Sequence, residues 1–279
     1  MGAIDILCND FSVEGIARNF LNTDEAELFA GKGRSDNLVG LSVPDMVSRM
    51  NENGVDKVLV TAIKVWDFFH QRMHSENSPA DIHALCKEAP DRVHGLYGIN
   101  PFTRMEGVRE LEKVVKEFGF VGAHIHPHGF DLRPDDAFYF PFYAKCEELD
   151  VPVVLSMGHT MDFLPNENGR PLHLDKVALY FKNLKIISTH TGWPWVEENI
   201  ALASKHPNVF IGTSAYAPKY WKPELVKFLN SWGRNKVMWG TDYPLIMHDE
   251  SLAQIDELGL REESKKALLE GNARSVFGL

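Results

Sequence analysis

Residues 104–126, RMEGVRELEKVVKEFGFVGAHIH, hold the pattern that decides the fold. Over 104–118 the apolar residues recur at steps of three and four, so they share one face of a helix and leave Glu and Lys residues on the other. After a break of two residues, a run of apolar and β-branched residues predicts a strand over 121–126. A helix that leads at once into a buried strand indicates a β/α repeat and a parallel sheet.

The same alternation runs along the rest of the chain. Continuous apolar runs suit strands that are buried on both faces, and they predict strands at 3–8, 57–61, 94–99, 121–126, 153–156, 185–189, 209–213 and 236–240. Helical patterns fit 44–53, 79–88, 104–118, 136–149, 195–206 and 223–232. Eight such units favour closure into an α/β fold of the (β/α)₈ TIM barrel class, and we expect residues 1–279 to form one domain.

The composition excludes several classes of partner. The 279 residues carry a formal net charge of −10, which argues against a nucleic-acid-binding surface. Three cysteines without a CxxC motif argue against a disulfide framework and predict a cytoplasmic location. We find no basic, apolar leader pattern and no apolar run long enough for a membrane helix, so we expect no membrane partner.

The connections between the predicted elements differ in length. Helix-to-strand connections are short, whereas those after the first, second and fifth strands are long. Long loops usually carry function, and in a barrel all strand-to-helix loops open on the carboxyl face, where active sites lie. We therefore expect the active site at that face.

Histidines and one aspartate stand at the ends of four predicted strands, in the segments GAHIHPH, PVVLSMGHT, KIISTHTGWPW and KVMWGTDYP. Imidazole and carboxylate groups are ligands of Zn²⁺ and similar ions, and three or four with a water form an open catalytic site. The expected metal ligands are His124, His159, His190 and Asp242. Because side chains alternate along a strand, we expect His124 to face the barrel interior and His126 to face the helices in a structural role.

Other residues near these strand ends are candidates for substrate binding. We expect Trp193, Tyr216, His128 and Ser156 to contact substrate, and Trp195, Tyr220 and Trp221 are further candidates for the pocket wall. Cationic candidates for holding an anionic substrate are Arg34, Lys64, Arg133 and Lys219. The spacing of His70 and His74 would suit a metal if this segment were helical. Phe68, Phe69, Phe138 and Phe140 are candidates for an interface or a lid.

Several segments, in order, resemble one family. They are Asp5 in an Ile-Asp opening, and residues 120–127 (FVGAHIHP), 135–158, 184–195 (LKIISTHTGWPW), 236–244 (KVMWGTDYP) and 271–279 (GNARSVFGL). They are similar to the amidohydrolase-related metal-dependent hydrolases and decarboxylases, the branch with aminocarboxymuconate-semialdehyde and resorcylate decarboxylases. The resemblance implies a (β/α)₈ barrel of the metal-dependent hydrolase type.

The family's metal set is only partly present. The resemblance implies an HxH on the first strand, a histidine on the fifth, often one on the sixth, and an aspartate on the eighth. The corresponding residues here are Leu7, Asn9, Ser156, His190 and Asp242. Leu cannot ligate, and Asn and Ser are poor ligands beside imidazole. One alternative is the displaced site of four ligands given above, with one divalent ion, Zn²⁺. The other is no metal, with Asp242 and His190 as an acid–base pair.

We expect an enzyme that acts on a small carboxylated organic substrate. The first expectation is hydrolysis of an amide, ester or lactone by a metal-bound water, with Asp242 and His190 as catalytic residues. The alternative is non-oxidative decarboxylation at the same site. A third possibility is a non-catalytic subunit that pairs with an active barrel of the same family, and a small-molecule binding module is the weakest. We also expect an oligomer, either of identical chains or with a related barrel.

Overall fold

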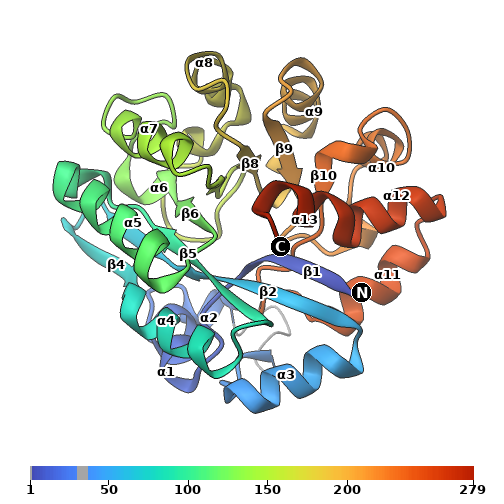
Figure 1. Ribbon diagram of the computed structural model, residues 1–279, viewed down its shortest axis with the longest axis horizontal. Helices are drawn as coiled ribbons and strands as arrows, with labels where there is room; N and C mark the ends of the chain where they lie inside the picture. The colour runs from blue at the N-terminus through green and yellow to red at the C-terminus, as the bar shows by residue number, and fades with distance from the viewer. Residues whose placement is uncertain (1, 30–36) are drawn as a thin grey trace.

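Eight parallel strands form one sheet in the computed structural model, which describes residues 2–29 and 37–279 (Figure 1). In sheet order the strands are β1 (Ala3–Cys8), β2 (Val55–Ala62), β5 (Val93–Gly98), β6 (Gly122–Ile125), β7 (Val153–Leu155), β8 (Ile186–Ser188), β9 (Val209–Gly212) and β10 (Val237–Met238). Each overlaps one of the eight predicted strands. The predicted α/β barrel is therefore confirmed.

Backbone contacts between the first and last strands close the barrel. The Ile6 amide donates to the Trp239 carbonyl at 3.2 Å, and the Asn9 amide donates to the Tyr243 carbonyl at 2.9 Å. In return, the Asp242 amide donates to the Leu7 carbonyl at 2.9 Å. Closure thus places the carboxyl end of β1 directly beside the residues that follow β10.

The barrel interior is a packed apolar core at one end. Inward residues of the strands pack with residues of the last helix in one apolar cluster. The cluster contains Ile4, Ile6, Leu59, Leu96, Val154, Ile187 and Met238 from the strands and Ala273, Val276 and Phe277 from the helix. That helix, α13 (Asn272–Phe277), crosses this end of the barrel near both termini (Figure 1). In the described chain, the barrel interior is therefore filled by apolar side chains at this end of the strands.

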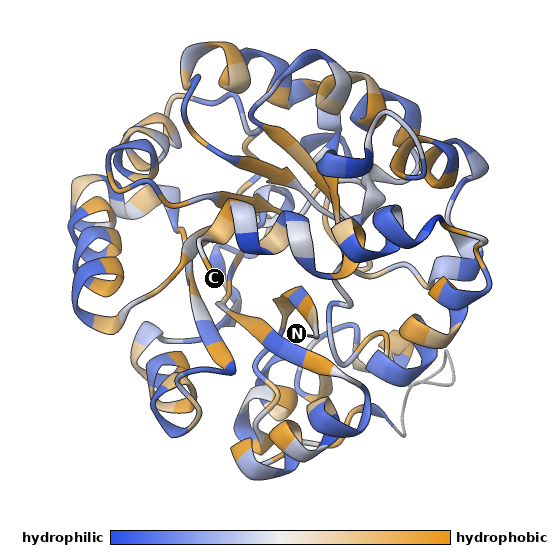
Figure 2. Cartoon of the chain, turned by 45° about the vertical axis from the view of Figure 1, so that its right-hand side comes forward, coloured by the Kyte–Doolittle hydropathy of each residue, from blue (hydrophilic) through white to orange (hydrophobic). Residues whose placement is uncertain are grey.

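Helices surround the sheet, with apolar residues toward the strands and polar residues outward (Figure 2). Helix α5 (Arg104–Phe118) buries Val108, Leu111 and Val114 as its periodicity predicts, and it ends at Gly119, whose φ of 71° suits glycine. The other longer helices are α3 (Val43–Glu52), α4 (Pro79–Glu88), α7 (Phe140–Glu148), α8 (Leu174–Tyr180), α9 (Val196–Lys205), α10 (Pro223–Leu229) and α11 (His248–Asp256). Shorter ones are α1 (Val13–Ile16), α2 (Ala26–Phe29), α6 (Pro127–Phe130) and α12 (Glu262–Lys266). Within residues 2–29 and 37–279, no helix is long and apolar enough to cross a membrane.

The long connection after β2 contains an antiparallel hairpin that the sequence analysis did not predict. Its strands are β3 (Lys64–Asp67) and β4 (Arg72–Glu76). His70 lies in the turn of this hairpin and His74 lies on β4. The hypothesis of a helical metal-binding pair at these two histidines is therefore wrong.

Candidate active site

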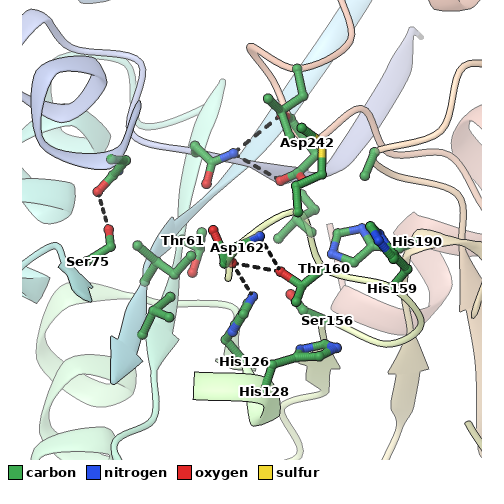
Figure 3. Close-up of a pocket in the computed structure, with 18 of the residues that line it drawn as sticks. Thr61, Ser75, His126, His128, Ser156, His159, Thr160, Asp162, His190 and Asp242 are labelled. Atoms are coloured by element: carbon green, nitrogen blue, oxygen red, sulfur yellow. Dashed lines mark hydrogen bonds and ion pairs between the residues drawn. The ribbon is translucent and has the colours of Figure 1, made fainter. Parts of the chain in front are cut away.

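A cavity of about 610 Å³ opens at the carboxyl ends of the strands. Half of the chain's 12 histidines line it. They are His74, His124, His126, His128, His159 and His190, and they share the wall with Asp162 and Asp242. Figure 3 shows the labelled members of this set arranged around one space. The cavity therefore lies at the face that the loop lengths predict.

Asp242 lies just beyond β10 in a left-handed backbone conformation, with φ of 58°. Its Oδ1 accepts a hydrogen bond of 2.9 Å from the Asn9 side-chain amide. Desolvation in the cavity raises the pKa of Asp242 to about 7, helped by the negative charges of Asp5 and Asp162 and opposed by the Asn9 hydrogen bond. This carboxyl group therefore holds a proton for part of the time at neutral pH, which suits general acid–base catalysis.

Asp5 positions the segment that carries Asp242. The buried Asp5 carboxylate accepts a hydrogen bond of 2.9 Å from the Thr241 amide and another from the Thr241 hydroxyl. Its Oδ2 also lies 3.1 Å from Nε2 of His248. In the sequence, Asp5 was a mark of the family resemblance alone, although a carboxylate inside an apolar strand needs such partners when it is buried.

His190 follows β8 and also has a left-handed backbone, with φ of 54°. Its Nδ1 lies 3.0 Å from the Ser214 hydroxyl. Burial, together with the charge of His126, lowers the pKa of His190 to about 4, so the ring is neutral at pH 7. Left-handed backbone at two strand ends, those of β8 and β10, is typical of functional sites.

His124 lies on β6 and lines the cavity, as the alternation of the strand predicts. Its Nε2 lies 3.0 Å from the Ser156 hydroxyl, which lines the same cavity. Burial lowers the pKa of His124 well below its ordinary value. Both residues are therefore neutral groups at the cavity wall.

The structure corrects the expectation for His126. Because β6 ends at Ile125, the alternation of the strand does not extend to His126, and this ring lines the cavity instead of facing the helices. Its Nε2 lies 3.4 Å from Oδ2 of Asp162 (Figure 3). His128, in α6, donates from Nε2 to the Gly158 carbonyl at 2.9 Å, and burial lowers its pKa to about 3.

Aromatic residues form part of the wall, as expected for substrate contacts. The Trp193 ring lies 5.5 Å from that of His159 and 5.7 Å from that of Tyr216, between ring centres. All three residues line the cavity, and Tyr220 joins them. Trp195 and Trp221 are not among the described lining residues.

The expected cationic groups lie elsewhere. Lys64 pairs with Glu76, Arg133 with Asp135 and Lys219 with Glu250. No Lys or Arg of the described chain lines the cavity, and Arg34 lies outside the described residues. Phe68, Phe69 and Phe138 are exposed, whereas Phe140 packs on Phe181 with ring centres 5.4 Å apart. An interface or lid at these phenylalanines stays a prediction.

Three of the five residues that the family resemblance places at metal positions, Leu7, Asn9 and Ser156, do not suit a metal ion. Leu7 offers no ligand atom, and the Asn9 amide aims its N–H donors at the Asp242 carboxylate. The Ser156 hydroxyl is hydrogen-bonded to Nε2 of His124. Each of these positions therefore presents an apolar group, a donor or a hydroxyl where the ion needs a strong lone pair.

The displaced set of His124, His159, His190 and Asp242 shares the cavity but is not gathered closely. In the part of the chain that the structure describes, two groups of three residues bring His, Asp or Glu ligand atoms within 4.8 Å of one another. They are Asp24, Asp67 and His74, and Glu25, His74 and Asp162. The four-ligand site at the strand ends stays a prediction.

Comparison with known proteins gives the family. The amidohydrolase family matches residues 60–279. The chain is 26% identical over 209 residues to 2-keto-4-carboxy-3-hexenedioate hydratase of Sphingobium sp., a match that covers 61% of this chain and 60% of the hydratase. It is also 26% identical over 236 residues to gamma-resorcylate decarboxylase of Polaromonas sp., which covers 68% of this chain and 72% of that enzyme.

Solved structures show the same fold. An uncharacterized TIM-barrel protein from Bordetella bronchiseptica superposes with a TM-score of 0.78 at 22% identity, covering 100% of this chain and 99% of that one. A dihydroxybenzoic acid decarboxylase from Polaromonas sp., with bound manganese and the inhibitor 2-nitroresorcinol, superposes with a TM-score of 0.71 at 19% identity, covering 100% and 97%. The expected family is thus confirmed, and its named relatives are enzymes. The chain belongs to the amidohydrolase family.

Proposed function

We propose that this chain is a non-oxidative decarboxylase of small unsaturated or aromatic carboxylic acids, with Asp242 as the proton donor. The observation that carries the proposal is the position of the Asp242 carboxyl group in a cavity lined by imidazoles, where it accepts a hydrogen bond from Asn9 and where burial raises its pKa to about 7. Decarboxylation needs a proton on carbon, and a carboxyl group with a pKa near the working pH is an efficient donor. The resorcylate decarboxylase relative supports the same reaction class.

The reaction replaces a carboxylate by a hydrogen. The C–C bond to the carboxylate breaks, CO₂ leaves, and the electron pair remains on the carbon, where the conjugated system spreads it. Asp242 gives its proton to that carbon to form the new C–H bond, and it regains a proton from solvent. The neutral rings of His124 and His190 supply N–H donors for the carbonyl or hydroxyl oxygen that gains electron density.

The cavity wall suits such a substrate. Trp193, Tyr216 and Tyr220 offer flat surfaces for an aromatic or conjugated acid. Because the described wall contains no Lys or Arg, imidazole N–H groups would hold the substrate carboxylate without a permanent counter-charge. A localised charge in such surroundings is costly, and loss of CO₂ moves the negative charge from the carboxylate into the conjugated system, where it is spread over several atoms until the carbon is protonated.

Hydrolysis, the first expectation from the sequence, has support from the family but less from the relatives, which favour the decarboxylation alternative. The related decarboxylase structure contains manganese. If this chain also binds a divalent ion, residues other than Leu7 and Asn9 must be its ligands. Zn²⁺ at His124, His159, His190 and Asp242 stays a prediction, as do the oligomer and the pairing with a related barrel. Proton transfer from Asp242 requires this carboxyl group to be free of the ion, because a carboxylate that ligates a metal holds no proton.

The test is a turnover assay of the purified protein with added Zn²⁺ or Mn²⁺. The panel contains 2,6-dihydroxybenzoate, 5-carboxyvanillate, other hydroxybenzoates and conjugated dicarboxylates, with simple lactones and amides beside them. We expect CO₂ release from at least one acid, lost in Asp242→Asn and kept in Asp249→Asn, which removes an exposed carboxylate. Turnover of lactones or amides without CO₂ would establish hydrolysis instead. Inactivity on every compound would contradict the proposal and favour the non-catalytic subunit.

A further inference from the structure

We infer that the loops above the strand ends form a divalent metal site, with Glu25, His74 and Asp162 as ligands and His126 beside them as the fourth. These residues come from four different strand-to-helix connections. Glu25 lies between β1 and α3, His74 on the β3–β4 hairpin, His126 after β6, and Asp162 between β7 and α8. The three longest of these connections, which the sequence analysis singled out, thus each provide one ligand.

The distances are close to those of a coordination shell. Oε2 of Glu25 lies 3.2 Å from Nε2 of His74, which in turn lies 3.9 Å from Oδ1 of Asp162. The three ligand atoms all lie within 4.8 Å of one another. In a tetrahedral site with bonds of about 2.0–2.2 Å, neighbouring ligand atoms lie about 3.3–3.6 Å apart. Shifts of about 1 Å would therefore bring these three atoms to coordination distances, and Nε2 of His126 lies 3.4 Å from Oδ2 of Asp162, at the edge of the group.

A buried oxygen without a hydrogen bond points to a missing ligand. Glu25 is 2% exposed, and its Oε2 makes no hydrogen bond although Nε2 of His74 is near. Its other oxygen accepts a hydrogen bond of 2.8 Å from the Phe163 amide, which fixes the carboxylate in place. Nε2 of His74, 3.2 Å away, pairs with the free oxygen only as an imidazolium, so beside a neutral ring a cation would remove the cost of burying this oxygen.

The charge of the cluster also favours a cation. Two carboxylates, Glu25 and Asp162, meet two imidazoles, and no Lys or Arg of the described chain joins them through a recorded ion pair. The nearby Arg72 instead pairs with Asp24 at 2.6 Å and with Asp67 at 3.8 Å. With neutral imidazoles the cluster carries two negative charges, which one divalent ion balances.

The ligand set limits the identity of the ion. Two carboxylate oxygens with two imidazole nitrogens suit Zn²⁺ or Mn²⁺, whereas Ca²⁺ and Mg²⁺ prefer oxygen alone and Cu⁺ prefers sulfur. His74, His126 and Asp162 also line the cavity that contains Asp242. The ion would therefore face a substrate in the cavity. A role of the ion in holding the substrate carboxylate rests on the proposed function, whereas the binding of the ion to the protein does not.

The test measures metal binding without turnover. The chelator-treated protein is titrated with ZnCl₂ by calorimetry and with MnCl₂ by electron paramagnetic resonance. We expect one ion per chain and at least a 100-fold loss of affinity in Glu25→Gln and in His74→Ala. The matched control is Asp24→Asn, which changes the neighbouring carboxylate of the other group, and His190→Ala tests the site at the strand ends.

The outcomes separate the possibilities. Tight binding that is kept in Asp24→Asn and His190→Ala but lost in Glu25→Gln supports the site. Loss in Asp24→Asn with full binding in Glu25→Gln, or loss only in His190→Ala, overturns it, as does the absence of stoichiometric binding. Circular dichroism shows whether each variant is folded, and Glu25→Gln keeps the size of the side chain. Failure of decarboxylation with intact metal binding would contradict the proposed function alone.

Discussion

The side-chain amide of Asn9 donates a 2.9 Å hydrogen bond to Oδ1 of Asp242, across the junction that closes the barrel. The same amide donates to the Tyr243 carbonyl at 3.1 Å, so one side chain holds both the carboxylate and the backbone of the next residue. The resemblance to the family leads us to expect a metal-binding histidine at the position of Asn9. A neutral donor thus takes the place of a cation beside this carboxylate, which leaves Asp242 able to hold a proton.

Replacing Asp242 by Asn should abolish proton transfer. We expect kcat to fall by about 10²–10⁴-fold, the usual contribution of general acid catalysis. In the wild type, the rate should fall as pH rises through about 7, because the protonated form of Asp242 is lost there. Rate measurements from pH 5 to 9 check this, with Asp249→Asn as the control. A rate that increases through pH 7 would show that Asp242 acts as a base.

Replacing Asn9 by Ala should move this pH dependence upward. The Asn9 hydrogen bond lowers the pKa of Asp242, so its loss favours the protonated carboxyl group. A hydrogen bond to a charged group contributes about 1.5–3 kcal/mol, and we expect the fall in rate to shift upward by about one pH unit. The control is Asn51→Ala, an exposed residue of α3. A downward shift would contradict the assigned role of Asn9.

His128 should make the protein less stable in acid. Its pKa is about 3 in the folded protein, below the ordinary value of 6.5, so the unfolded chain binds this proton first as pH falls. The free energy of unfolding therefore decreases as pH falls below about 6.5, by about 2 kcal/mol at pH 5 for this group. Urea unfolding at pH 7 and pH 5 measures this decrease in the free energy of unfolding, and it should be smaller in His128→Gln than in the wild type. The control is Asn51→Ala, at an exposed residue that does not titrate, and it should leave the decrease unaltered.

Trp193 should act on substrate binding more than on chemistry. Its ring is 37% exposed and contacts His159 and Tyr216 at the cavity wall. Loss of an aromatic contact of about 0.5–1.5 kcal/mol predicts that Trp193→Ala raises KM about 3- to 10-fold with a smaller change in kcat. Trp232→Phe, at an exposed tryptophan outside the cavity, is the control. An unchanged KM would remove Trp193 from the substrate contacts.

The barrel could be predicted because its strands are local, continuous apolar runs. Each of the eight runs needs burial on both faces, and only a sheet covered by helices provides it. The β3–β4 hairpin was missed because its second strand, RMHSE, is polar and has no clear alternation. Its place above the barrel depends on contacts with other loops, which the sequence pattern does not contain.

The residues at the strand ends could be predicted for the same reason. His124, His190 and Asp242 stand where an apolar run stops, so the topology brings them to one face. The predicted orientation of His126 was wrong because the strand ends at Ile125, one residue earlier than predicted. Glu25 and Asp162 lie in loops without periodicity, and only the folded chain shows that they face each other across His74.

The central feature of the proposed mechanism is a proton on Asp242 at neutral pH. The most direct measurement is a carbon-13 NMR titration of protein labelled at the aspartate carboxyl carbon, in the wild type and in Asp242→Asn. We predict one carboxyl signal that titrates near pH 7 and is absent from the variant. If every aspartate signal of the wild type titrates below pH 5, Asp242 is ionised at neutral pH and cannot be the proton donor.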